Sequence, residues 1–147
     1  MIIEALAVNG LTMAGKSIFS HVIYDTYGLL KETTYPPEVD TTIAKLDLVA
    51  DLEVIESLIN TIEKCDNIEQ TPLAISLKQV NDMVHQIKNE LVEIKKVVEE
   101  HKKLYFANWR TPDYHIPLKR LRQHKDILDK RVTMLIELLK IIREDMN

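Results

Sequence analysis

The stretch "PLAISLKQVNDMVHQIKNELVEIKKVVEEHKKLY", residues 72–105, decides the fold class. Its apolar residues recur at alternating steps of three and four, which places them on one face of an α-helix. Thr71 and Pro72 supply a start signal, because a hydroxyl can cap a helix and proline is tolerated at its first position. The pattern predicts a long helix over 72–106 whose buried seam comprises Leu77, Val80, Val84, Ile87, Leu91, Ile94, Val98, His101 and Tyr105.

Three further segments carry helical patterns. The break at Pro36-Pro37 is followed by a predicted helix over 40–66, and a last helix is predicted over 113–145. Residues 3–31 read as the first helix, which is apolar nearly all round and is weakened by its glycines. The predicted seam of the last helix contains one charged intruder, Lys125, among Leu118, Leu121, Leu128, Val132, Leu135, Leu139 and Ile142. The seam of the 40–66 helix comprises Ile43, Leu46, Val49, Leu52, Ile55, Ile59 and Ile62.

The composition agrees with long helices. The 147 residues are 46% hydrophobic and 29% charged, but three glycines and 5% aromatic residues leave little material for a turn-rich β fold. We therefore expect an all-α protein, an antiparallel four-helix bundle with long helices and short Pro-containing connectors. It is expected to form one domain over 1–147, and it could be the N-terminal domain of a longer chain.

Charge is distributed unevenly along the chain. The net charge of −4 argues against a nucleic-acid partner, acidic residues predominate over 38–69, and basic residues predominate over 110–131. The basic residues either bind anionic lipid headgroups or phosphates, or face the acidic second helix and solvent. They are Lys119, Arg120, Arg122, Lys125, Lys130 and Arg131.

Residues 10–17, "GLTMAGKS", match the phosphate-loop pattern of nucleotide-binding enzymes. The ligating residues would be Gly10, Gly15, Lys16 and Ser17. Such a loop needs a buried strand before it, whereas residues 1–9 favour helix, and no other segment predicts the strands of a sheet. Small residues at this spacing also let a helix pack closely against its neighbours. We therefore disfavour the nucleotide-binding enzyme.

Other chemistry has little support in the sequence. The five histidines form no pair at the i, i+4 spacing of a helical metal site, and no nucleophile with an orienting base can be identified. We therefore predict no enzymatic activity, no cofactor and no metal. The single cysteine, Cys65, suits a reducing compartment, so a cytoplasmic location is expected.

Two long segments resemble a known group of domains. They are "IIEALAVNGLTMAGKSIFSHVIYDTYGLL", residues 2–30, and "LYFANWRTPDYHIPLKRLRQHKDILDKRVTMLIELL", residues 104–139. The small residues around Met13-Ala14-Gly15, and Trp109 ahead of a Leu/Arg/Lys helix, resemble the HeLo-type helical domains of fungal cell-death proteins and fungal nucleotide-binding receptors. The outline is also similar to the four-helix bundle of the mixed lineage kinase domain-like pseudokinases.

The resemblance implies a regulated cell-death effector in innate immune signalling, which oligomerises and permeabilises membranes. Its partners would be copies of itself, anionic membrane lipids and a regulatory domain, and activation would recruit it from the cytoplasm to the membrane. The basic residues of the last helix would bind headgroups. The membrane-inserting residues would be Ile2, Ile3, Leu6, Val8, Leu11, Met13, Ile18, Phe19, Val22 and Ile23. The alternative is an oligomerisation or adaptor bundle in signalling that has no membrane step.

Overall fold

The computed structural model describes residues 13–64, 72–103 and 113–145. These residues form helices and connections and include no strand, which confirms the prediction of an all-α protein. The helices are α2 (Met13–Lys31), α3 (Pro37–Leu46), α4 (Leu48–Ile62), α5 (Pro72–Lys103) and α6 (His115–Asp145).

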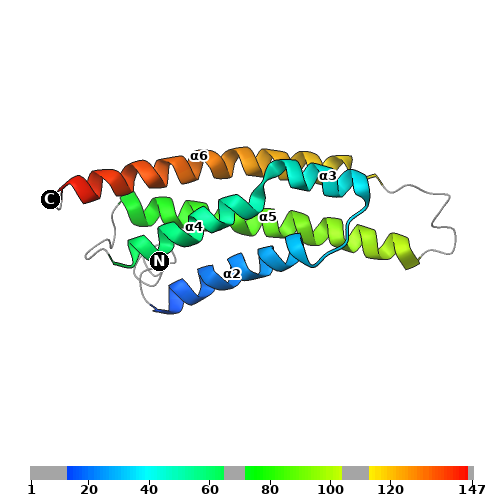
Figure 1. Cartoon of the computed structure of the whole chain (residues 1–147), viewed down its shortest axis with the longest axis horizontal. Coiled ribbons are helices and arrows are strands. Elements are labelled where there is room, and N and C mark those ends of the chain that lie inside the picture. The colour runs from blue at the N-terminus through cyan, green and yellow to red at the C-terminus, as the bar shows by residue number, and fades with distance from the viewer. Residues whose placement is uncertain (1–12, 65–71, 104–112, 146–147) are drawn as a thin grey trace.

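The helices lie side by side along the long axis of the molecule, and α3 and α4 together make one arm of the bundle (Figure 1). Helix α5 packs against α2 and α6, helix α4 packs against the same two helices, and α3 packs against α6. Helices α2 and α6 therefore each contact both α4 and α5.

The seam predicted for α5 is confirmed over its described length. Every apolar seam position from Leu77 to Val98 is buried, and His101 is half-buried. Tyr105 lies outside the described residues. Helix α6 follows its predicted seam equally closely, with five leucines buried and Val132 and Ile142 half-buried against the core.

The predicted single helix over 40–66 was wrong, because the segment is divided at Asp47. This residue has left-handed backbone angles, φ 53° and ψ 41°, and its N–H donates to the Ala44 carbonyl at 3.2 Å. Aspartate tolerates this conformation better than most residues. The break changes the helical phase, so that Leu48 is buried in place of the predicted Val49, which is half-buried.

The start of this arm also differs from the prediction. Helix α3 begins at Pro37, three residues before the predicted start, because proline is favoured in the first helical turn. The N–H of Asp40 donates to the Pro36 carbonyl at 2.8 Å. In the connection before it, the buried Tyr35 donates its hydroxyl to the Leu29 carbonyl at 2.7 Å, which ties this connection to the end of α2.

Helix α2 has one buried face. Phe19, Val22 and Ile23 lie in the core, and the buried Thr26 donates its hydroxyl to the Val22 carbonyl at 2.7 Å. The expectation that this helix is apolar nearly all round is therefore wrong for residues 19–31. Polar side chains such as Ser20 and His21 occupy its exposed face.

A substitution at Gly28 tests how much the helical stability of α2 contributes to the free energy of unfolding. Gly28 lies inside α2 without a positive φ, and a Cβ added there would meet Glu32 Oε2 at 3.7 Å, an ordinary contact. Gly28→Ala should raise the free energy of unfolding by about 0.5–1 kcal/mol, because alanine is the better helix former. Urea denaturation followed by circular dichroism measures this, and a lowered midpoint would contradict it.

Candidate functional site

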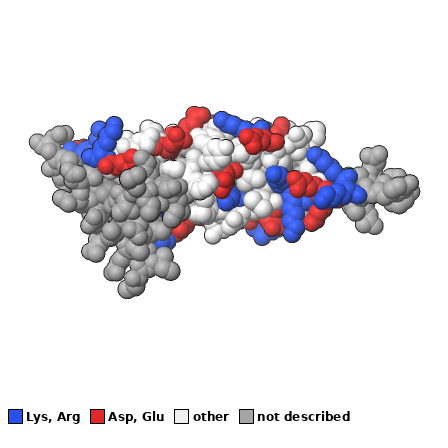
Figure 2. Space-filling model, turned by 90° about the horizontal axis from the view of Figure 1, so that it is seen from below, with Lys and Arg blue, Asp and Glu red and all other residues white. Residues whose placement is uncertain are grey.

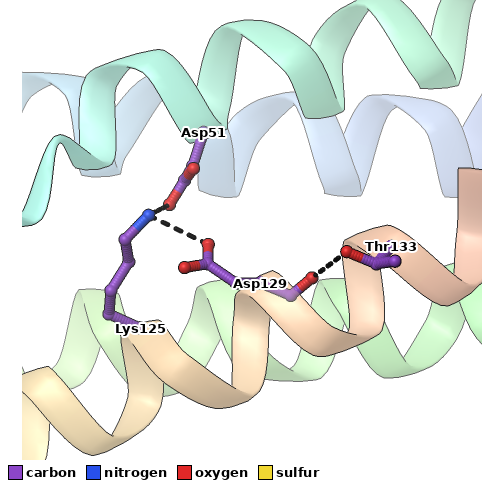
Figure 3. Close-up of polar contacts among 4 residues, drawn as sticks. All are labelled: Asp51, Lys125, Asp129 and Thr133. Carbon is purple, nitrogen blue, oxygen red and sulfur yellow. Dashed lines mark hydrogen bonds and ion pairs between the residues drawn. The ribbon is translucent and has the colours of Figure 1, made fainter.

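A polar contact joins α4 to α6 at the charged intruder of the predicted seam (Figure 3). Lys125 Nζ donates to Asp51 Oδ2, and it donates to Asp129 Oδ1 at 2.9 Å. Thr133 Oγ1 in turn donates to the backbone carbonyl of Asp129 at 2.8 Å. The side chains of Lys125 and Asp51 are only 16% and 21% exposed.

The contact explains why a lysine is tolerated in an apolar seam. Burial lowers the pKa of Lys125, but the hydrogen bonds to both carboxylates outweigh burial, so its pKa is raised. Burial raises the pKa of Asp51, against the opposite effect of Lys125. Lys125 therefore stays charged at neutral pH, and its contribution to stability is lost only as pH rises through its raised pKa. The charged group of Lys125 is therefore engaged within the bundle by Asp51 and Asp129.

The other basic residues of α6 fall into two groups. Arg131 Nη1 donates to the Gln79 carbonyl at 2.9 Å, and Arg120 Nε lies 3.6 Å from Glu90 Oε1, so both attach α6 to α5. The remaining three are exposed, and none has an ion-pair partner in the described part of the chain. They are Lys119, Arg122 and Lys130.

A groove of about 700 Å³ runs between α2 and α5. Lys88 Nζ lies 3.2 Å from Asp25 Oδ2 across it, and Lys31 Nζ lies 4.8 Å from the centre of the Tyr27 ring. Figure 2 views the molecule from the side of α2 and shows interleaved acidic and basic side chains toward the end at which α2 and α5 finish. The seam between these two helices is therefore partly polar.

Two smaller hollows, of about 240 and 410 Å³, lie along α2 and α4. Tyr27 lines both of them as well as the larger groove, while Glu56 and Asn60 contribute from α4. Helix α2 is consequently flanked by hollows on both sides. Its described side chains attach it through the buried face that holds Phe19, Val22 and Ile23, with Tyr27, Leu29 and Leu30 half-buried against the core.

The residues predicted to insert into a membrane are only partly described. Phe19, Val22 and Ile23 are buried in the core. Met13 and Ile18 lie in α2, although their side chains are outside the described part. The rest of the predicted set lies outside the described residues: Ile2, Ile3, Leu6, Val8 and Leu11.

The phosphate-loop residues are also partly described. Gly15, Lys16 and Ser17 lie within α2, whose backbone is helical from Met13. In a phosphate loop a non-helical turn follows a strand and extends to the second glycine, and the helix starts at the lysine; here the backbone is already helical at Met13, two residues before Gly15. Gly10 lies outside the described residues.

Searches for other sites give two findings. Within the described ranges, no group of three or more His, Cys, Asp or Glu side chains is placed to hold a metal ion. Across 13–64, 72–103 and 113–145, no helix combines the length and apolar character that crossing a bilayer requires.

Comparisons with protein family models, with curated proteins and with solved structures find no match for this chain.

Lys125→Met tests the contact between α4 and α6. The substitution leaves the mostly buried Asp51 without its cation, so the free energy of unfolding should fall by about 1–3 kcal/mol. Arg122→Met, on an exposed position of the same helix, should change it by less than about 0.5 kcal/mol. Urea denaturation of both variants measures the difference, and equal effects would show that the contact contributes nothing.

Proposed function

We propose that this chain is a non-enzymatic helical bundle that self-associates and, once α2 separates from it, permeabilises anionic membranes as a regulated cell-death effector. The proposal includes an antiparallel packing of four arms, in which α3 and α4 count as one, and recruitment to the membrane on activation. The observation that supports it is that the described side chains of α2 pack on the core through one face, between hollows on both sides.

Separation of α2 requires an activating partner. Burial of Phe19, Val22 and Ile23 stabilises the closed bundle by about 1.5–3 kcal/mol for each side chain, so the open state is scarcely populated without a partner. An activating signal has to bind the open state more tightly than the closed one. A lipid surface offsets part of the cost, because the same three side chains can enter its apolar region.

The exposed cations of α6 would hold the open protein on the membrane. Lys119 and Arg122 are available for headgroups, and each is worth about 1 kcal/mol near an anionic surface. Lys125 and Arg131 are left out of this role, because their charged groups bind within the bundle. Arg120 is more than half exposed beside Glu90 and can contribute weakly.

A second candidate is an oligomerisation or adaptor bundle without a membrane step. Exposed apolar side chains on α6 favour it, because they could bind another protein. The phosphate-loop enzyme is not carried forward, since the helical backbone from Met13 does not suit such a loop.

Lys88→Glu tests the release of α2. It places a carboxylate opposite Asp25 and should loosen the seam between α2 and α5. We expect dye leakage from phosphatidylserine-containing liposomes to rise several-fold over the wild type. The double variant Asp25→Lys/Lys88→Glu restores opposite charges and should return leakage to the wild-type rate.

A deletion of residues 1–12 is the matched control for the apolar segment. It removes five of the predicted membrane-inserting residues but leaves the core residues of α2 in place. Leakage should fall while the helical circular dichroism spectrum is retained. The membrane step is wrong if Lys88→Glu and Asp25→Lys/Lys88→Glu cause equal dye leakage from the liposomes. It is also wrong if neither variant causes leakage in any oligomeric state.

Headgroup binding is tested by the double substitution of Lys119 and Arg122 to Glu. Loss of two cations at about 1 kcal/mol each should weaken binding to anionic vesicles by roughly 30-fold at low salt. The matched control changes the exposed Lys45 and Lys96 to Glu, with the same change in net charge. Vesicle flotation at low and high salt compares them, and equal loss in both would assign binding to net charge alone.

A further inference from the structure

Helix α6 carries a row of exposed apolar side chains on the outside of the bundle. Ile127, Met134 and Ile141 are 38%, 55% and 53% exposed. They are seven residues apart, nearly two helical turns, so they lie along one line of about 21 Å. Large apolar side chains aligned in this way form a helix face that the described helices of the bundle cover only in part.

Charged residues border this row in a definite order. Lys130 and Glu137 lie on one side of the row, because each follows a row residue, Ile127 or Met134, by three positions. On the other side, four residues beyond Ile127, lies Arg131. Lys130 and Glu137 are exposed, and Glu137 makes only a surface ion pair with Lys140 at 3.5 Å.

We propose that a second copy of this chain covers the row, with its α6 antiparallel to the first. Met134 then faces Met134 of the second copy across a two-fold axis, and Ile127 packs against Ile141 of that copy. This inference rests on the self-association step of the proposed function and names the surface that carries it out.

The bordering charges select the antiparallel direction. In an antiparallel pair, the side of the row that carries Lys130 and Glu137 faces the same side of the second copy. Lys130 then lies level with Glu137 of the second copy, and symmetry makes this contact twice. In a parallel pair, the side that carries Lys130 faces the opposite side of the second copy, which carries Arg131. This brings Lys130 beside Arg131 of the second copy. Antiparallel packing therefore joins opposite charges where parallel packing joins like charges.

The same charges argue against lipid as the occupant of the row. Glu137 and Glu144 border its C-terminal half and would be repelled by anionic headgroups. The interface contains six half-exposed apolar side chains and two ion pairs, which is small for a protein dimer. The dimer should therefore depend on protein concentration.

Crosslinking tests the geometry in the full chain, with Cys65→Ser as background. Met134→Cys should couple to itself with a short homobifunctional maleimide, because the two-fold axis brings both thiols together. Ile127→Cys should couple to Ile141→Cys when the two proteins are mixed. Ile127→Cys should not couple to itself, because antiparallel packing separates the two copies of this position by about 21 Å.

Sedimentation velocity tests the energetics. Met134→Glu and Lys130→Glu should each raise the dimer dissociation constant at least tenfold, and Lys130→Glu/Glu137→Lys should restore dimerisation. Tyr24→Glu, at a 73% exposed position on α2, is the matched control and should leave it unchanged.

Three results would overturn the inference. Coupling of Ile127→Cys to itself would indicate a parallel pair. Self-association that survives Met134→Glu would place the interface elsewhere and leave the proposed function standing. A wild-type protein that stays monomeric at every concentration would remove both this interface and the self-association step, whereas liposome leakage reports the membrane step separately.

Discussion

The apolar seam of α5 has to be buried by a helix on each of two sides, and the rest of the bundle depends on how firmly each of these helices is attached. Helix α6 supplies one cover of 31 residues, reinforced by Arg131 and, through α4, by Lys125. Helix α2 supplies the other with 19 residues, bordered by hollows and joined across the groove by Asp25 and Lys88. The two sides of the same seam are therefore held with unequal strength, and that inequality makes one helix the candidate for movement.

Periodicity in the sequence was sufficient to predict the all-α fold and the buried seams of α5 and α6, because burial of a helix face depends on local spacing. It did not predict the break at Asp47, since the surrounding residues are compatible with a continuous helix. Nor could it explain Lys125, because the carboxylate of Asp51 that compensates it lies 74 residues away in the chain. The apolar pattern of one segment does not predict its contacts with a distant segment.

The candidate site shows the same limit. The sequence grouped six basic residues as one patch, but the distances divide them into bundle contacts and exposed cations. The seven-residue spacing of Ile127, Met134 and Ile141 is present in the sequence, but spacing alone does not distinguish these residues from the buried leucines of the same helix. Spacing shows that residues share a face, whereas only the packed structure shows which face remains uncovered.

The hydrogen bond from Tyr35 to the Leu29 carbonyl has a mechanical consequence. It ties the C-terminal end of α2 to a buried residue, so in the proposed opening we expect the helix to swing about that end. The fulcrum is then near Leu29, and the stretch from Met13 to Leu29 gives an arm of about 24 Å. A swing of that arm carries its far end over most of the thickness of a bilayer's hydrocarbon layer, about 30 Å, while the rest of the bundle stays in place.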